Sequence, residues 1–323
     1  YPYFFDVEGF PEVEMVGLNA DQQERNLESF QRLIRMAHDR GLKFKVGIWD
    51  HIYRGGVQGG GIPGTETASN EPVEGLVWGV NDENLIPYTK AALAKFIDVF
   101  PGIDGIQFRI HDESGIEDEE QLDFWRDVFS MIKETAPDMH YVLRAKGMQE
   151  SVIQTALDAG VDFAIGTKYW MERMGMPYHP THINPHNQFD RRHGYADMLR
   201  YPKEYKLHWR MWNGGTNRIL LWGNPEYTRR FAESTHLYDG QGFELNEPLA
   251  TKMLAQPHDT VPFDLLQPPY RYYDYEFERY WHFFQSFGRV AYNPDVSPEL
   301  WHKEFVLRFG EEAGPIVERA LQQ

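Results

Sequence analysis

The chain has 323 residues, no cysteine, and 49 acidic against 32 basic side chains, which gives a formal net charge of −17. The absence of cysteine excludes disulfides and thiolate metal sites, and the acidic balance argues against a nucleic-acid partner. No run of eighteen apolar residues occurs, which argues against a membrane span, and the length is sufficient for one large core.

Helically spaced apolar residues predict helices and alternating ones predict strands, and the two kinds of segment alternate along the chain. The first helix is expected over 22–40, where Gly41 ends it, and a strand follows over 44–51. The glycine-rich, aperiodic stretch 54–84 is typical of a long functional loop. Further helices are expected over 86–100, 117–136, 149–159, 226–234, 270–290, 298–309 and 311–321. Further strands are expected over 105–111, 140–146, 162–170, 206–212, 218–222 and 242–246.

Strands that alternate with helices predict a parallel sheet, and we interpret it as a (β/α)8 TIM barrel with C-terminal helices. Seven strands are predicted, so we expect the first strand of the barrel to lie upstream of this fragment. A doubly wound open sheet is the alternative, although no dinucleotide-type glycine fingerprint follows any strand. We expect residues 1–323 to be a single catalytic domain, with a helical extension over about 294–323, within a longer multidomain chain.

Polar side chains recur on one side of each predicted strand. In 105–111, Ile106, Phe108 and Ile110 alternate with Gln107 and Arg109, and the polar side faces the interior if the apolar side meets the helices. The same parity predicts that the following residues lie at the mouth of the barrel: Trp49, His51, Arg109, His111, Glu113, Arg144, Lys146, Lys168, Trp170, His208, Arg210, Trp212, Trp222, Glu244 and Asn246.

The few carboxylates in this set are candidates for chemistry. Glu113 and Glu244 lie on the inward side, with Asp112 and Glu247 next to them. Cleavage of a glycosidic bond needs two carboxyl groups, one to protonate the leaving oxygen and one to attack or to activate water. The alternative is that each carboxylate is a buried partner for a neighbouring arginine.

Cations predominate in the predicted mouth although the chain is acidic. A guanidinium binds a carboxylate through two parallel hydrogen bonds, which favours an anionic substrate such as a uronic acid or a sulfated sugar. The alternative is that these cations only pair with Asp50, Glu113 and Glu244. The cations in question are Arg109, Arg144, Lys146, Lys168 and Arg210.

A histidine-rich loop is the remaining candidate, with His179, His182, His186, Asp190 and His193. Imidazoles at such spacing can hold a metal. Pro180 and Pro185 exclude a regular helix and no H-E-x-x-H arrangement occurs, so we expect these side chains to bond to backbone or substrate instead. Trp170, Trp212 and Trp222 are either sugar-stacking platforms or ordinary packing residues.

Short motifs resemble barrel glycoside hydrolases of the bacterial α-glucuronidase type. The acidic turn Asp112-Glu113-Ser114-Gly115 is similar to that family's Asp-Ser-Glu-Gly turn, with the order changed. The segments 167–170, 214–218 and 242–248 are similar to those of large bacterial carbohydrate-active proteins. The resemblance implies that Glu113 is the general acid and that basic residues hold a uronate.

We therefore expect a glycosidase that acts on an acidic poly- or oligosaccharide without a cofactor or metal. Glu113 is the expected acid, Glu244 the base or nucleophile, and Glu247 the reserve for that role. The predicted substrate-binding residues are Trp49, His51, Arg109, His111, Asp112, Arg144, Lys168, Trp170, Arg210, Trp212, Trp222 and Asn246.

Two other functions are also compatible with the sequence. The chain could be a barrel that binds glycan without cleaving it, or a metal-dependent hydrolase with an ion on His179, His182 and His186. An extracytoplasmic location is favoured, with any targeting sequence upstream of Tyr1.

Overall fold

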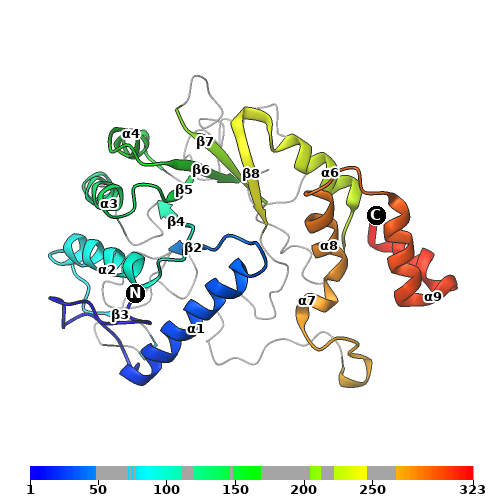
Figure 1. The fold of residues 1–323 in the computed structure, drawn as a ribbon, viewed down its shortest axis with the longest axis horizontal. Helices are drawn as coiled ribbons and strands as arrows, with labels where there is room; N and C mark the ends of the chain where they lie inside the picture. The colour runs from blue at the N-terminus through cyan, green and yellow to red at the C-terminus, as the bar shows by residue number, and fades with distance from the viewer. Residues whose placement is uncertain are drawn as a thin grey trace. The chain divides into compact units, whose positions relative to one another are not determined.

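The computed structural model describes residues 1–48, 72, 74–75, 77–110, 116, 119–145, 148–168, 204–211, 222–245 and 267–322. It is a mixed α/β protein in which helices and strands alternate along the chain (Figure 1). Two compact units are present, the first spanning Tyr1–Gly166 and the second including Lys206–Gln323.

The first unit contains four strands in the order β2-β4-β5-β6, each parallel to its neighbours. This order is also the order along the chain, and a helix lies between each pair of consecutive strands, as in repeated βαβ units. The strands are β2 (Lys45–Ile48), β4 (Gly105–Ile110), β5 (His140–Ala145) and β6 (Phe163–Lys168). The connecting helices are α2 (Leu85–Val99), α3 (Gln121–Thr135) and α4 (Glu150–Asp158), which lie side by side in Figure 1.

The N-terminal part of this unit precedes the sheet. A short antiparallel pair joins β1 (Glu14–Met15) to β3 (Val77–Trp78). Helix α1 (Ala20–His38) begins at Asn19, whose side chain accepts the N–H of Gln22 while the Gln22 side chain accepts the N–H of Asn19. Such a capping box satisfies two N–H groups that have no partner inside the helix, which fixes the start of α1.

An aromatic cluster forms the core between β4 and α3. Phe108 lies edge-on to Trp125, with ring centroids 5.5 Å apart, and stacks on Tyr141 of β5 at 5.8 Å. All three side chains are buried. The apolar side of β4 therefore faces the helix layer, as the alternation in the sequence predicts, and Gln107 and Arg109 project from the opposite side of the strand.

The second unit contains β7 (Lys206–Met211) and β8 (Gly240–Leu245), which are parallel neighbours. Helix α6 (Pro225–Ser234) and the short η4 (Leu237–Asp239) connect them. Asn224 caps α6 by accepting the N–H of Tyr227, and Pro225 occupies the first turn, where its missing N–H costs nothing. The C-terminal elements are η5 (Pro268–Tyr270), α7 (Glu276–Arg279), α8 (Trp281–Val290) and α9 (Pro298–Gln322).

Most predicted elements are confirmed in the described residues, and one helix is wrong in part. The expected helix over 270–290 is interrupted, because residues 271–275 are not helical and α7 and α8 follow them. Glu278 accepts the backbone N–H groups of Asp274 and Tyr275, which makes helix α7 begin only after this segment. Helix α9 has non-helical geometry at Gly310, where the sequence predicts the break between two helices.

The strands of the described residues are consistent with a barrel-like α/β fold, but they do not form a closed eight-stranded barrel. The expected strand over 218–222 lies outside the described residues except for Trp222, which is not in a strand. Among the helices that the structure describes, none combines the length and the apolar character needed to cross a membrane.

A histidine is buried in the aromatic core of the C-terminal helices. The His282 ring of α8 lies 4.8 Å from the Phe305 ring centroid and 5.9 Å from that of Trp301, both in α9. Burial lowers the pKa of His282 to about 4, and the backbone of Gly223 opposes this shift only in part. The packing of α8 on α9 therefore depends on a neutral imidazole.

This burial predicts acid sensitivity. The unfolded ring, with a pKa near 6.5, takes up a proton that the folded ring does not take up until about pH 4. Stability from this group is therefore complete above pH 6.5 and is lost as the pH falls toward 4, by up to about 3 kcal/mol. Urea unfolding of wild type and His282→Phe from pH 7 to 4.5 measures the effect. As the pH falls, the free energy of unfolding of wild type should decrease relative to that of His282→Phe. A difference that does not change with pH would show that His282 is not buried in its neutral form.

Candidate active site

Two arginines lie side by side on neighbouring strands of the first unit. Arg109 of β4 and Arg144 of β5 are Cα partners in the parallel register. Their side chains are almost completely buried, with 8% of Arg109 and 1% of Arg144 exposed. Neighbouring strands are about 4.8 Å apart, so two guanidinium groups of like charge start from adjacent positions inside the protein.

Buried charge of one sign is costly unless an anion accompanies it. Removing a charged group from water costs several kcal/mol, and a second like charge adds to this cost. Both arginines have electrostatic or hydrogen-bonding partners, so the pair is accommodated rather than exposed to solvent. Two buried arginines therefore occupy adjacent register positions near the ends of β4 and β5.

The second unit holds a charged cluster on β7 and β8. Arg210 is the register partner of Glu244, and its Nε donates a hydrogen bond to Oε1 of that carboxylate. The guanidinium side chain is 4% exposed, whereas the Glu244 side chain is 25% exposed. The imidazole Nε2 of His208 lies 3.9 Å from the second oxygen of Glu244. Glu244 is thus held from one side by a buried cation and keeps access to solvent.

The position of β8 depends on a close approach at its first residue. The indole N–H of Trp209 in β7 donates to the carbonyl of Thr235 at 3.0 Å, just after α6. Gly240 lies against both groups, because a Cβ atom at this position would be 1.7 Å from the Thr235 oxygen and 2.7 Å from the Trp209 nitrogen. Only glycine fits there, and this contact sets where the strand that carries Glu244 begins.

Many of the predicted site residues lie outside the described residues. Of the others, Lys168 is described only as part of the backbone of β6. Trp222 is half-buried, and its ring packs edge-on against Tyr227 at 5.3 Å, as an ordinary packing residue does. The predicted positions outside the described residues are Trp49, His51, His111, Asp112, Glu113, Lys146, Trp170, Trp212, Asn246 and Glu247.

His208 was predicted to face inward from the alternation in β7, but we predicted no catalytic or binding role for it from the sequence. Its distance from Glu244 depends on the pairing of β7 with β8, and the sequence of one strand does not contain that register. Within the described ranges, no group of three or more metal-binding side chains is close enough to hold an ion. The predicted histidine loop, with His179, His182, His186 and His193, lies outside those ranges.

The arrangement supports acid–base or nucleophilic chemistry at a carboxylate. An ion-paired glutamate that is still accessible to solvent is suited to attack an electrophilic carbon or to activate water, because its partner holds it in one orientation. Glu244 has this arrangement.

Two solved structures share this fold. A GH138 enzyme targeting pectin rhamnogalacturonan II matches 99% of the chain with a TM-score of 0.67 and 14% sequence identity. CpGH89 from Clostridium perfringens, in a variant with two glutamates changed to glutamine and in complex with its substrate GlcNAc-α-1,4-galactose, matches 99% of the chain with a TM-score of 0.51 and 12% identity.

The chain spans about a third of these larger proteins, namely 36% of the GH138 enzyme and 33% of CpGH89. No protein-family model matches the sequence, and no curated protein matches it. At these identities the likeness shows the fold alone. The chain therefore has the fold of a glycoside hydrolase region, as the resemblance in the sequence implied, and the likeness does not extend to the α-glucuronidase type.

The close approach at Gly240 gives a stability prediction. In Gly240→Ala, the added methyl group meets backbone and indole atoms that cannot move aside, so we expect a loss of about 3 kcal/mol. Gly288→Ala is the matched control, because a Cβ atom at this position in α8 meets nothing within 4 Å, and alanine should add about 0.5–1 kcal/mol through helix propensity. Urea unfolding separates the two variants, and a Gly240→Ala protein as stable as wild type would contradict the close approach.

Proposed function

We propose that this chain is the catalytic region of a glycoside hydrolase that cleaves an acidic polysaccharide. Glu113 is the proposed general acid, and Glu244 is the base or nucleophile, with Glu247 as the alternative for that second role. Arg109 and Arg144 bind the carboxylate of a uronic acid unit. No metal or organic cofactor takes part in this mechanism.

The single observation that carries the proposal is the ion pair between Glu244 and Arg210. A glycosidase needs one carboxyl group that is ionised and fixed in direction when the oxocarbenium-like transition state forms. Arg210 donates the hydrogen bond that fixes the direction of the Glu244 carboxylate, and the partial exposure of Glu244 leaves it accessible to a sugar. His208 approaches the other oxygen and is proposed as a positioning residue.

The buried arginine pair of the first unit supports an acidic sugar. A guanidinium binds a carboxylate through two parallel N–H donors, and a neutral sugar offers no charge of opposite sign. The GH138 enzyme that shares this fold targets a pectic polysaccharide, rhamnogalacturonan II, and pectic oligosaccharides are therefore the first substrates to test on this chain. Uronides of the α-glucuronidase class are the second.

A barrel that binds glycan without cleaving it is the competing function. It accounts equally well for Arg109 and Arg144, but it gives no reason for an ion-paired carboxylate on β8 that remains accessible to solvent. A metal-dependent hydrolase with an ion on His179, His182 and His186 stays a separate prediction, because these residues lie outside the described ranges.

The role of the carboxylates is tested by Glu113→Gln and Glu244→Gln. The amide keeps the size of each side chain and, at position 244, an acceptor for Arg210, so the fold should be retained. We expect kcat on acidic oligosaccharides to fall by about a hundred- to ten-thousandfold in each variant. The control is Glu233→Gln, which alters an exposed glutamate of α6 that pairs with Arg229. Wild-type turnover by Glu244→Gln would refute its assignment as base or nucleophile.

The charge preference is tested by Arg144→Met, which fills a similar volume without the guanidinium. For matched aryl glycosides that differ only in a carboxylate or a hydroxymethyl group, we expect the kcat/KM of the uronide to fall by about tenfold or more, the equivalent of about 1.4 kcal/mol. The hexoside should change much less. Equal losses on both substrates would assign Arg144 a structural role only.

A further inference from the structure

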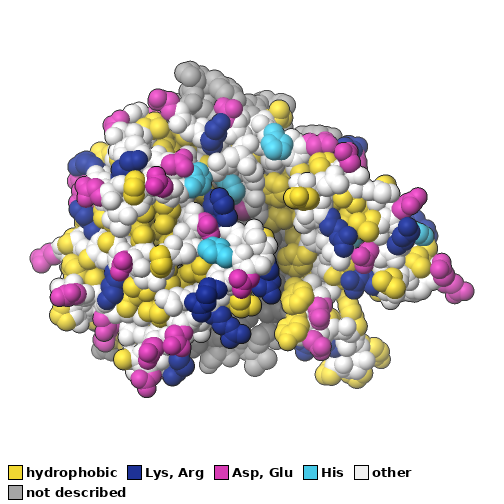
Figure 2. All heavy atoms as spheres, in the orientation of Figure 1, with side chains coloured by type: hydrophobic (Ala, Val, Ile, Leu, Met, Phe, Trp, Pro, Cys, Tyr) yellow, Lys and Arg dark blue, Asp and Glu magenta, His cyan; other side chains and the backbone are white. Residues whose placement is uncertain are grey.

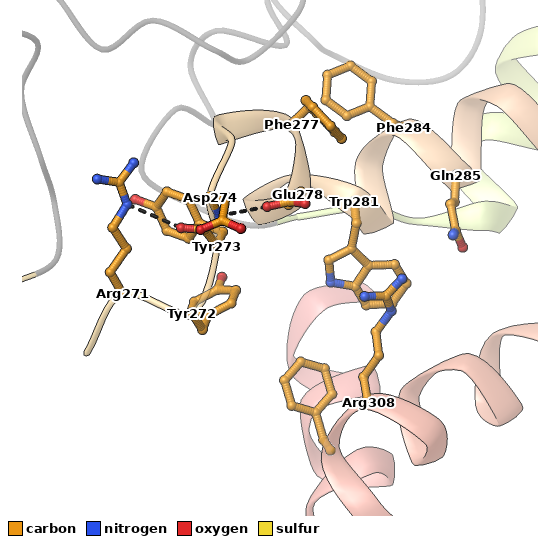
Figure 3. A pocket seen from close by; sticks show the side chains of 11 residues that line it. Arg271, Tyr272, Tyr273, Asp274, Phe277, Glu278, Trp281, Phe284, Gln285 and Arg308 are labelled. Atoms are coloured by element: carbon orange, nitrogen blue, oxygen red, sulfur yellow. Dashed lines mark hydrogen bonds between the residues drawn. The ribbon is translucent and has the colours of Figure 1, made fainter. Parts of the chain in front are cut away.

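A groove of about 1000 Å³ lies within the second unit, and none of its lining residues belongs to the candidate active site. It is partly open to solvent and is as large as the pockets that hold drug-sized ligands. One side comes from the segment before α7 and from α7 itself, and the other from α8 and α9 (Figure 3). We call it the aromatic groove, and its lining includes Tyr272, Phe277, Trp281, Phe284 and Phe309.

Two aromatic side chains at the edge of this groove, and a third that stacks on one of them, are more than half exposed. Tyr272 is 58% and Phe277 54% exposed, and Tyr275, which stacks on Phe277 with the ring planes 9° apart, is 64% exposed. Single exposed aromatic residues are common on protein surfaces, but a contiguous group marks an interaction site. In Figure 2 the surface over α7 is largely hydrophobic and is interrupted by acidic and basic side chains.

Polar groups of both signs stand among these rings. Arg308 lies 4.1 Å from the centroid of the Trp281 ring, which holds the guanidinium against the floor of the groove. Glu278 is fixed by the backbone N–H groups of Asp274 and Tyr275, and these bonds hold the pKa of its carboxyl below its usual range. The groove therefore presents oriented donors and oriented acceptors next to apolar ring faces.

The combination selects among ligand classes. Two arginines, Arg271 and Arg308, and two carboxylates, Asp274 and Glu278, line the groove, so its charge favours neither an anionic nor a cationic ligand. A purely apolar ligand would remove these charges from water without compensation. A pyranose ring has an apolar face for an aromatic ring and hydroxyl groups that both donate and accept. We infer that the aromatic groove binds neutral sugar units of a glycan chain.

This inference adds a second carbohydrate contact to the proposed function but does not depend on it. If the chain is a glycosidase, the groove is an additional site for the neutral sugar units of its polysaccharide. If the chain does not cleave glycans, the groove still predicts affinity for neutral oligosaccharides. The two proposals therefore have separate tests.

The test is calorimetric titration of the protein with neutral galactan, arabinan and rhamnose-containing oligosaccharides. It is carried out in a Glu244→Gln background, so that hydrolysis does not consume the probe. The double variant Tyr272→Ala/Phe277→Ala removes two exposed rings whose loss should not affect folding. Tyr292→Ala is the matched control, because Tyr292 is 92% exposed and does not line the groove.

We expect at least one neutral oligosaccharide to bind, and its Kd to rise by tenfold or more in the double variant and to stay unchanged in Tyr292→Ala. No binding of any neutral probe, or equal binding by the double variant, would overturn the inference. So would sedimentation showing that the rings hold two copies of the chain together and that the double variant is a monomer. Absence of turnover with retained groove binding would refute only the proposed function.

Discussion

The burial of arginine side chains inside parallel strands is the constraint on which the rest of this structure depends. Strands in a parallel sheet are covered on both faces and are usually apolar throughout. Here Arg109, Arg144 and Arg210 are at least nine-tenths buried in such strands. Each requires negative charge nearby, and this requirement determines where a carboxylate of the protein or of a ligand can be bound.

The surroundings of the buried arginines differ between the two units. In the second unit the counter-charge is Glu244, the register partner of Arg210, so the parallel pairing of β7 and β8 brings anion and cation together. In the first unit Arg109 and Arg144 are themselves register partners, and both also have other interaction partners. Catalysis by Glu244 and anion recognition by the arginine pair are the roles that we propose for the two units.

Much of the fold was predictable, because it depends on local periodicity. The period-two pattern of 105–111 correctly placed Phe108 against the helix layer and Arg109 on the opposite side, since this choice needs only the burial of alternate residues. The helices were predictable from apolar spacing and from end signals such as Gly41. The aromatic stretch over 270–290 was misjudged, because the bonds of Glu278 to the backbone of Asp274 and Tyr275 outweigh the helical pattern there.

For the candidate site, the sequence could predict only the side of each strand on which a residue lies. Parity indicated that Arg144, Arg210 and Glu244 face inward, but the pairing of Arg210 with Glu244 depends on the register between strands that are thirty-four positions apart. The aromatic groove was not foreseen, because its walls come from helices whose packing no single segment encodes. The predicted acid, Glu113, lies outside the described residues and remains a prediction.

The roles proposed for the two carboxylates and the two arginines can be checked in a crystal structure of the Glu244→Gln variant with an acidic oligosaccharide. We expect the uronate carboxylate to lie within hydrogen-bonding distance of the Arg109 or Arg144 guanidinium. We also expect the glycosidic oxygen to lie between the side chains of residues 113 and 244. A sugar bound with its carboxylate in solvent, or with its glycosidic bond remote from both of these positions, would refute these roles.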